Sequence, residues 1–259
     1  MNDLRIIFCQ QYIVWGDPEA NRRHVEEDMN SIPNDTDIFV VPETFTTGFG
    51  QHMATLAEPV EGPTLQWARR MAAEHRLLFV GTWTVHDGDR CYNRLHWIYP
   101  NGTYGYYDKA HTFRVSGEAD QINCGTRRAV FEYKGWRIKP AVCYDLRFPK
   151  WLRNGKLDTE NGKLEYDLLI ICANWPGSRH EAWTTLLKAR AIENLCYVVG
   201  CNRIGTDQEG ILYTGDSAAV DYKGLIIATG DSEQSISATL HKDALDTFRE
   251  HWPFYLDFD

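Results

Sequence analysis

The sequence has no apolar run long enough to cross a membrane, no basic block and no Cys-x-x-Cys pair. A transmembrane helix needs about 20 consecutive apolar residues, and the apolar run in the N-terminal MNDLRIIFCQQ is too short for a signal peptide. We therefore expect that the protein does not associate with a membrane. We also expect a cytoplasmic location. The seven cysteines, an odd number, are typical of free thiols in a reducing compartment.

Positive charge is also sparse. Lys and Arg number 27 against 36 Asp and Glu, which gives a formal net charge of -9. Proteins that bind nucleic acid need clustered positive charge to neutralise phosphates, whereas Lys and Arg are scattered here. We therefore expect no nucleic acid among the partners.

Core-forming residues, in contrast, are plentiful. The chain has 259 residues, of which 43% are hydrophobic, and this is enough for one large core or two modest ones. Strand-like apolar runs continue from one end of the sequence to the other. We expect a single domain over residues 1–259, of the α/β class.

The N-terminal half alternates strands with helices. Asp17 and Pro18 are typical of the N-cap and first position of a helix, and Asn101-Gly102 predicts a tight hairpin. The apolar runs predict strands at 4–9, 37–41, 77–85, 92–99 and 103–107, and helices starting at 17 and over 64–76.

The C-terminal half follows a similar plan, which suggests two βα layers that share one core. Hairpins are predicted around Lys134-Gly135 and around Lys223-Gly224, the second spanning 217–229. The other expected elements are strands at 136–143, 166–172 and 196–201 and helices at 149–157 and 180–195.

Polar residues follow several of these buried strands. Glu43, Cys143 and Asn174 come at or after the ends of apolar runs, and Lys109 comes just after a strand. Folds of the α/β class gather functional groups where strands end. We therefore expect these side chains to lie along one edge of a sheet.

Cys143 lies in the segment KPAVCYDLRFPK, where a buried strand meets a turn. A thiol at such a corner can act as a nucleophile if a base takes its proton and a cation awaits the oxyanion. Glu43 is the candidate base, and Lys109 could hold the oxyanion and keep Cys143 as a thiolate. The alternative is that Cys143 is an ordinary buried thiol, which is the usual state of a free cysteine.

Other polar and aromatic residues are weaker candidates. Glu118, in the irregular loop after Lys109, could pair with that lysine or orient a substrate. Asn174 and Trp175 could line the pocket with an amide donor and an aromatic wall. Each of these residues, and likewise Glu43 and Lys109, has an ordinary alternative as a solvated or packed side chain.

The combination of these settings resembles the nitrilase superfamily of carbon-nitrogen hydrolases. The stretches VVPETFTTGF, YDKAHTF and AVCYDLRFP match the family's Glu, Lys and Cys motifs, and Gly117-Glu118 is similar to the second glutamate of many members. The stretches ANWP, KARAIENLCYVVGCNRIG and YTGDSAAVDYKG also resemble their counterparts. Three separate motifs in the right order are a specific signal.

The resemblance implies a four-layer αββα sandwich of the nitrilase type, usually dimerised through one helical face, so we expect a homodimer or larger homo-oligomer. Cys143 would attack a nonpeptide C–N bond, and Glu43 would pass the thiol proton to the leaving ammonia. Lys109 and the backbone N–H of Tyr144 would hold the oxyanion. A water activated by Glu43 would then release the acid from the thioester. The resemblance implies no metal and no organic cofactor.

Within the family, the stretches TTGF, HTFRVSGE, CYDLRFP and NWP look most like those of omega-amidases. These enzymes cleave the terminal amide of 2-oxo acid amides such as 2-oxoglutaramate and 2-oxosuccinamate, so the implied partner is a small-molecule amide. Its distal carboxylate needs a cation, and a guanidinium can pair with it through two hydrogen bonds. Arg147 or Arg179 could serve, although Arg147 could equally brace the turn at Cys143.

Other interpretations stay open. The chain could be a nitrilase-family amidase or N-carbamoyl hydrolase that acts on another small substrate. It could also be a Cys-His hydrolase, with His111 as the nearest histidine in setting, or a noncatalytic binding protein that keeps the fold. A zinc site at Cys196 and Cys201 is disfavoured, because this pair lies in an apolar strand run without a second pair of ligands.

Overall fold

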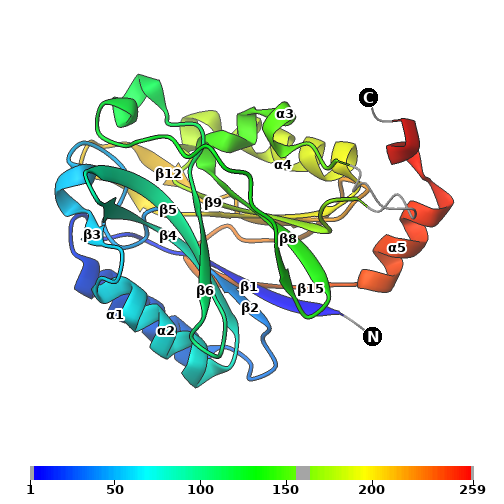
Figure 1. The fold of residues 1–259 in the computed structure, drawn as a ribbon, viewed down its shortest axis with the longest axis horizontal. Helices are drawn as coiled ribbons and strands as arrows, with labels where there is room; N and C mark the ends of the chain where they lie inside the picture. The colour runs from blue at the N-terminus through cyan, green and yellow to red at the C-terminus, as the bar shows by residue number, and fades with distance from the viewer. Residues whose placement is uncertain (1–2, 156–163, 258–259) are drawn as a thin grey trace.

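Two β-sheets stacked face to face form the centre of the molecule (Figure 1). The computed structural model describes residues 3–155 and 164–257. The strands of the first sheet, in spatial order, are β15 (Gln234–Leu240), β1 (Leu4–Gln10), β2 (Ile38–Val40), β4 (Leu78–Asp87), β5 (Arg90–Ile98) and β6 (Tyr104–Asp108), with β3 (Glu58–Pro59) paired to β4.

The second sheet is built on the same principle, with parallel strands at its centre and antiparallel strands at its edges. Its strands, in spatial order, are β14 (Ile226–Thr229), β13 (Ala218–Val220), β10 (Tyr197–Asn202), β9 (Leu168–Ala173), β8 (Trp136–Val142) and β7 (Phe131–Tyr133). Strands β8, β9 and β10 run parallel here, as β1, β2 and β4 do in the first sheet. A separate two-stranded ribbon consists of β11 (Ile204–Thr206) and β12 (Leu212–Thr214).

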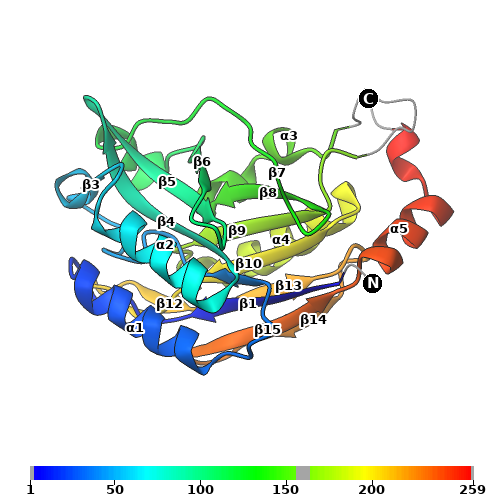
Figure 2. The same ribbon diagram turned by 60° about the horizontal axis from the view of Figure 1, so that its bottom comes forward.

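Helices cover the outer faces of both sheets (Figures 1 and 2). On the first sheet lie α1 (Pro18–Ser31) and α2 (Pro63–His75), and on the second lie α3 (Pro149–Leu152) and α4 (His180–Asn194). The fifth helix, α5 (Lys242–His251), lies at one end of the molecule, after β15. The short 3-10 helices are η1 (Met53–Leu56), η2 (Arg114–Ser116), η3 (Glu118–Asp120), η4 (Cys143–Arg147), η5 (Gly177–Arg179) and η6 (Phe254–Asp257).

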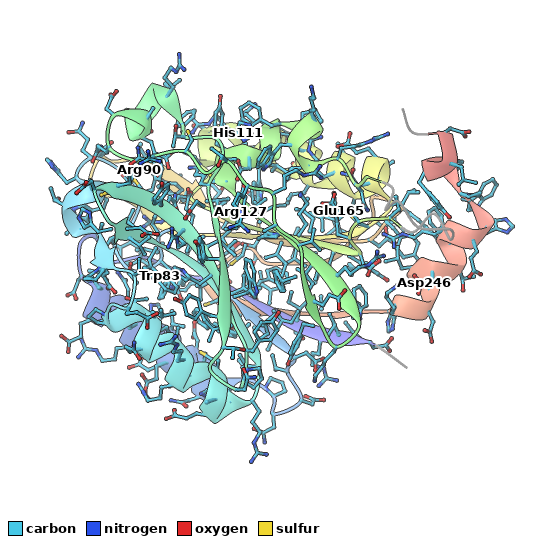
Figure 3. The ribbon with its side chains drawn as sticks, viewed as in Figure 1. Trp83, Arg90, His111, Arg127, Glu165 and Asp246 are labelled. Carbon is cyan, nitrogen blue, oxygen red and sulfur yellow. The ribbon has the colours of Figure 1, made fainter. Side chains whose placement is uncertain are left out.

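Apolar side chains fill the spaces between these layers. Strands buried on both faces read as continuous apolar runs, because one face packs on the other sheet and the opposite face packs on helices. In β2, Val40 belongs to the core between the sheets, whereas Phe39 belongs to the core under α1 and α2. Trp83 of β4, labelled in Figure 3, lies in this second core. The αββα sandwich predicted from the sequence is thus confirmed.

Most local predictions agree with the structure within a few residues. Asp17 is the N-cap of α1, where its side chain accepts a hydrogen bond of 2.9 Å from the backbone N–H of Ala20. The predicted helix at 149–157 is mostly wrong, because α3 ends at Leu152 and residues 153–155 are irregular; the rest of that range lies outside the described residues. The sequence analysis did not identify β11, β12, β15 or α5.

The prediction of a single sheet edge for the polar residues is also wrong. Glu43 and Lys109 follow β2 and β6 of the first sheet, whereas Cys143 and Asn174 follow β8 and β9 of the second. The candidate site therefore lies where strand ends of both sheets meet.

None of the helices within 3–155 and 164–257 is long and apolar enough to span a membrane.

The packing of α4 on the second sheet generates a stability prediction. A Cβ atom at Gly200 of β10 would lie 2.7 Å from the side chain of Trp183 and 2.8 Å from that of Leu187. We expect Gly200→Ala to lower the free energy of unfolding by about 1–3 kcal/mol, because it overpacks this contact. Urea unfolding followed by circular dichroism measures the effect.

Gly155→Ala is the matched control, because among the described residues the nearest atom to its added Cβ would be 4.0 Å away. The same unfolding midpoint for both variants would contradict the packing argument.

Candidate active site

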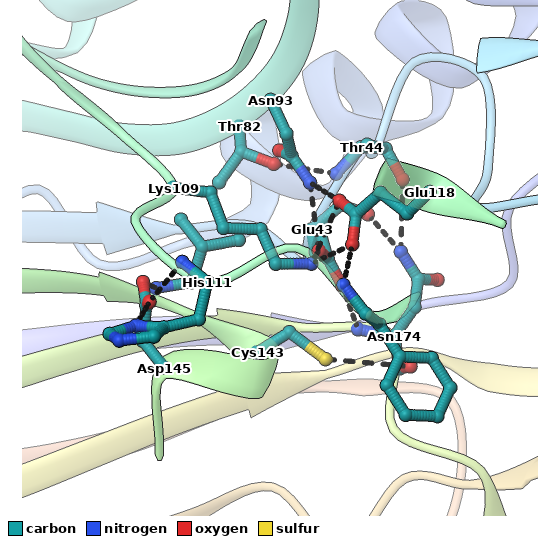
Figure 4. A network of polar contacts seen from close by, with 12 residues as sticks. Glu43, Thr44, Thr82, Asn93, Lys109, His111, Glu118, Cys143, Asp145 and Asn174 are labelled. Carbon is teal, nitrogen blue, oxygen red and sulfur yellow. Dashed lines mark hydrogen bonds and ion pairs between the residues drawn. The ribbon is translucent and has the colours of Figure 1, made fainter. Parts of the chain in front are cut away.

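Glu43 lies in the loop that follows β2, and its side chain is fully buried. One carboxylate oxygen, Oε1, accepts hydrogen bonds from Lys109 Nζ at 2.9 Å and from Asn93 Nδ2 at 2.8 Å. The other oxygen, Oε2, accepts from the backbone N–H of Asn174 at 2.9 Å. Figure 4 shows these contacts converging on Glu43. Three donors from different segments therefore fix the orientation of this carboxylate.

Lys109 follows β6 and is likewise fully buried. Its Nζ lies 2.9 Å from Glu43 Oε1 and 2.8 Å from Glu118 Oε2. Burial by itself lowers the pKa of Lys109, but Glu118, Glu43 and Cys143 together raise it above its ordinary value. The two carboxylates therefore favour the cationic form of Lys109.

Glu118 begins η3, in the loop that the sequence analysis considered irregular. Besides Lys109, its carboxylate accepts a hydrogen bond of 2.6 Å from the backbone N–H of Phe113. Burial raises the pKa of Glu118, and Lys109 opposes this effect only in part. The structure thus places Glu118 beside Lys109, which was one of its two predicted positions.

Cys143 is the first residue of η4, directly after β8, and its φ of 43° lies in the left-handed region. Few non-glycine residues adopt this conformation, and it is common at functional sites. Its Sγ lies 3.7 Å from the backbone oxygen of Asn174. Burial, and then the Glu43 carboxylate, raise the pKa of the Cys143 thiol, and Lys109 offsets them only partly. The expected resting thiolate is therefore disfavoured, and attack requires a base.

Asn174 connects the base to the nucleophile. Its side-chain Nδ2 donates to the backbone oxygen of Glu43 at 2.5 Å and to Thr44 Oγ1 at 3.0 Å. The amide that was predicted to line the pocket thus mainly holds the Glu43 loop. Trp175 is buried, and its Nε1 donates to the backbone oxygen of Arg179 at 2.9 Å.

A cavity of about 440 Å³ opens above Cys143 and Lys109. Tyr144, Asn174, Trp175, Arg147 and Arg179 all line it, so the structure brings the predicted substrate-binding residues together. The remaining lining residues are Phe49, Gly50, Gln51, Phe113, Val115, Ser116, Pro176, Ser178, Asp207, Glu209, Ile211 and Tyr213.

Two exposed arginines supply positive charge to this cavity. The Arg147 guanidinium lies 4.9 Å from the ring centroid of Trp175, and the Arg179 guanidinium lies 5.3 Å from that of Phe113. Within the part of the chain that the structure describes, neither forms an ion pair with a carboxylate. Both can therefore receive an anionic group of a bound molecule.

His111, the base of the Cys-His alternative, is engaged elsewhere. Its Nδ1 lies 2.7 Å from Asp145 Oδ1, and its ring stacks on Phe148 with centroids 3.6 Å apart. In Figure 4 the ring is turned toward Asp145, whereas Cys143 Sγ points toward Asn174. This geometry disfavours His111 as the base for Cys143.

The sequence analysis missed two buried residues of this region, Asn93 and Asp145. Asn93 lies in β5 between Cys91 and Leu95, at the inward positions of an alternating strand. A polar residue at such a position must find a hydrogen-bond partner, and this signal could have identified it. Asp145 has no comparable signal, because its segment reads as a polar turn.

Of the other six cysteines, five are buried and Cys124 is exposed. Cys196 and Cys201 are fully buried, and burial raises the pKa of both thiols, as is typical of core cysteines. Across residues 3–155 and 164–257, no group of three or more His, Cys, Asp or Glu side chains is arranged to hold a metal ion.

Several known proteins are similar to this chain over most of its length. The carbon-nitrogen hydrolase family matches residues 5–250. The omega-amidase YafV of Yersinia enterocolitica is 41% identical over 100% of this chain and 98% of its own length. The 2-oxoglutaramate amidase of Bacillus subtilis is 31% identical over 89% of this chain and 88% of its own length.

A solved structure is also similar to this chain over its full length. The crystal structure of a CN-hydrolase superfamily protein from Xanthomonas campestris, with an arsenic adduct in its active site, is 41% identical in sequence. It matches with a TM-score of 0.97 and covers 100% of this chain and 98% of its own.

The buried charges generate a prediction for Lys109→Met. This change leaves Glu43 and Glu118 buried without their cation, so we expect a loss of about 3–5 kcal/mol in the free energy of unfolding. A carboxyl group whose pKa is raised on folding is most favourable when protonated, so its contribution to stability falls as pH rises through that pKa. The loss should therefore be larger at about pH 8 than at about pH 5.

Thermal unfolding of wild type and variant at both pH values measures this difference. Lys188→Met, at an exposed position of α4, is the control and should change the melting temperature little at either pH. A loss in Lys109→Met that does not vary with pH would show that the carboxylates do not cause it.

Proposed function

The chain belongs to the carbon-nitrogen hydrolase family, and we propose that it is an omega-amidase-type thiol amidohydrolase. It is a hydrolase that acts on nonpeptide C–N bonds. The proposed reaction converts 2-oxoglutaramate or 2-oxosuccinamate to the 2-oxo acid and ammonia. The observation that carries this proposal is the convergence of Cys143, Glu43, Lys109 and Glu118 below a cavity lined by the guanidinium groups of Arg147 and Arg179.

The first proposed step is attack of Cys143 Sγ on the amide carbon. Because the pKa of Cys143 is raised, the thiol proton must leave as the bond forms, and the neighbouring Glu43 carboxylate takes it. The carbonyl oxygen becomes an oxyanion held by the Lys109 ammonium and the backbone N–H of Tyr144. The permanent charge of Lys109 stabilises this oxyanion without any further proton transfer.

Collapse of the tetrahedral intermediate breaks the C–N bond. Glu43 gives its proton to the leaving nitrogen, and ammonia departs while the acyl group stays on Cys143 as a thioester. Glu43, again ionised, takes a proton from a water molecule that attacks the thioester. Collapse of this second tetrahedral intermediate breaks the C–S bond and releases the carboxylic acid. Glu43 returns its proton to the Cys143 sulfur, which restores both the thiol and the ionised carboxylate. Glu118 holds Lys109 throughout and does not exchange a proton with the substrate.

The cavity suits a small substrate with a carboxylate at its far end. Its volume of about 440 Å³ lies toward the lower end of small-molecule sites. Arg147 belongs to the same short helix as Cys143, so its backbone lies close to that of the nucleophile. We propose that Arg147 binds the distal carboxylate and that Arg179 contributes less.

Other expectations from the sequence stay predictions. These are the single domain over 1–259, the cytoplasmic location, the homodimer or larger homo-oligomer, and the absence of a metal or organic cofactor.

The reaction is tested by ammonia release from 2-oxoglutaramate. We expect Cys143→Ala to abolish it and Glu43→Gln to lower kcat by at least about 100-fold, because the base is lost. His111→Ala should retain part of the activity. The opposite order, with Glu43→Gln active and His111→Ala inactive, would favour the Cys-His hydrolase. Unchanged turnover in Cys143→Ala would exclude Cys143 as the nucleophile.

The arginine assignment is tested by comparing a charged substrate with a neutral one. For Arg147→Met we expect KM for 2-oxoglutaramate to rise about 10- to 100-fold, the cost of one charge-assisted hydrogen-bonded pair. KM for a neutral amide of similar length should change little. Arg179→Met is the matched control, and a larger rise in that variant would transfer the role to Arg179. Turnover of nitriles or N-carbamoyl compounds in place of 2-oxo acid amides would retain the family and change the substrate.

A further inference from the structure

Asp145 is a fully buried carboxylate two residues after Cys143, and it does not line the cavity. It accepts four hydrogen bonds. Oδ2 accepts from the backbone N–H of Val142 at 3.1 Å and from Tyr107 OH at 2.8 Å. Oδ1 accepts from the backbone N–H and the Nδ1 of His111, at 3.0 and 2.7 Å. Each carboxylate oxygen of Asp145 thus binds two donor groups of the protein.

These donors connect the two segments that carry the reacting groups. Val142 directly precedes Cys143 at the end of β8, whereas Tyr107 and His111 lie two residues before and two residues after Lys109. Val142 belongs to β8 of the second sheet, whereas Tyr107 belongs to β6 of the first sheet. One carboxylate thus joins the strand end of the nucleophile to the strand end of the oxyanion cation.

The donors themselves are held in place. Tyr107 OH also accepts from Trp151 Nε1 at 2.9 Å, and the His111 ring stacks on Phe148 with an interplanar angle of 10°. Hydrogen bonds in a buried network of this kind strengthen one another and restrict the orientation of each member. The position of Asp145 is therefore fixed from several sides.

Cys143 needs such support because of its backbone conformation. A left-handed φ of 43° at a non-glycine residue persists only where the surrounding structure enforces it. The hydrogen bond from Val142 N–H to Asp145 Oδ2 spans the cysteine and closes the corner at that point. Loss of this bond would let the corner relax and move Sγ relative to Lys109.

We propose that Asp145, with Tyr107 and His111 as its donors, is a positioning residue. It holds Cys143 in the position relative to Lys109 that the reaction needs. It touches neither the substrate nor the reacting atoms. The inference rests on the proposed function only in taking Cys143 as the nucleophile, and it does not depend on which amide is the substrate. Under this proposal His111 acts through Asp145 and not as a base.

The test is Asp145→Asn, which keeps the shape of the side chain. Whichever oxygen becomes the amide nitrogen, one backbone N–H, of Val142 or of His111, loses its acceptor. Since a misplacement of about 1 Å can cost about 100-fold, we expect kcat to fall at least about 10-fold while KM stays within about twofold. Alkylation of Cys143 by iodoacetamide, followed by mass spectrometry, should slow by a similar factor.

Asp167→Asn is the matched control. Asp167 is also buried, and it accepts hydrogen bonds from the backbone N–H of Arg137 at 3.1 Å and from Arg249 Nη1 at 2.6 Å. It therefore ties β8 to α5 without contact with the corner at Cys143. We expect Asp167→Asn to lower the melting temperature but to leave kcat and the alkylation rate of Cys143 unchanged.

Two further variants remove single donors and keep the test decisive if Asp145→Asn does not fold. Tyr107→Phe and His111→Ala should each lower kcat and the alkylation rate, by less than Asp145→Asn. Folded Asp145→Asn with kcat and alkylation within about twofold of wild type would overturn the proposal, as would an equal fall of kcat in Asp167→Asn. If Asp145→Asn does not fold, wild-type behaviour of both single-donor variants would overturn it.

The alkylation readout also separates this inference from the proposed function. A wild-type protein that does not hydrolyse 2-oxoglutaramate would contradict the proposed substrate. Slower alkylation of Cys143 in the Asp145 variant would still support the positioning role.

Discussion

The interaction on which the site depends is the ammonium of Lys109 buried between the carboxylates of Glu43 and Glu118. Burying charged groups costs more than an ion pair returns unless the geometry is good and the remaining donors and acceptors are satisfied. Here the backbone N–H groups of Phe113 and Asn174 and the amide of Asn93 complete the two carboxylates. The buried charges are stable only where fixed hydrogen-bond donors surround the carboxylates. The segments that follow the strands of the two stacked sheets hold these donors in place.

The four-layer fold explains how residues from distant segments of the chain meet at this site. Glu43 and Lys109 come from the first sheet and Cys143 from the second, so no single sheet could hold the site. Asn174 links the Glu43 loop to Cys143, because its side chain binds the Glu43 backbone and its carbonyl faces the thiol. Asp145 makes the corresponding link between Cys143 and the segment around Lys109. The relative placement of base, cation and nucleophile therefore depends on contacts across the interface between the sheets.

These cross-sheet contacts also explain where prediction from the sequence succeeded and where it stopped. Apolar runs such as DIFVV, and helix signals such as Asp17-Pro18, are local, and the elements that they predict are present. Strand β15 was missed because QSISATL is half polar and pairs with β1, at the opposite end of the sequence. Asp145 was missed for the same kind of reason. Two of its donors, Tyr107 and His111, are 38 and 34 residues away, and no local pattern indicates them. The motifs around Glu43, Lys109 and Cys143 predicted that these residues act together, but not that they come from two sheets.

The raised pKa of the Cys143 thiol is compatible with its proposed role as a nucleophile. Loss of the thiol proton to solvent would add a negative charge to a buried site that already contains two carboxylates, and the low local dielectric makes that unfavourable. Transfer of the same proton to Glu43 leaves the total charge of the site unchanged. When the thiolate attacks, its charge moves to the substrate oxygen, toward the Lys109 ammonium. The proton therefore needs to leave Cys143 only when a substrate is in place.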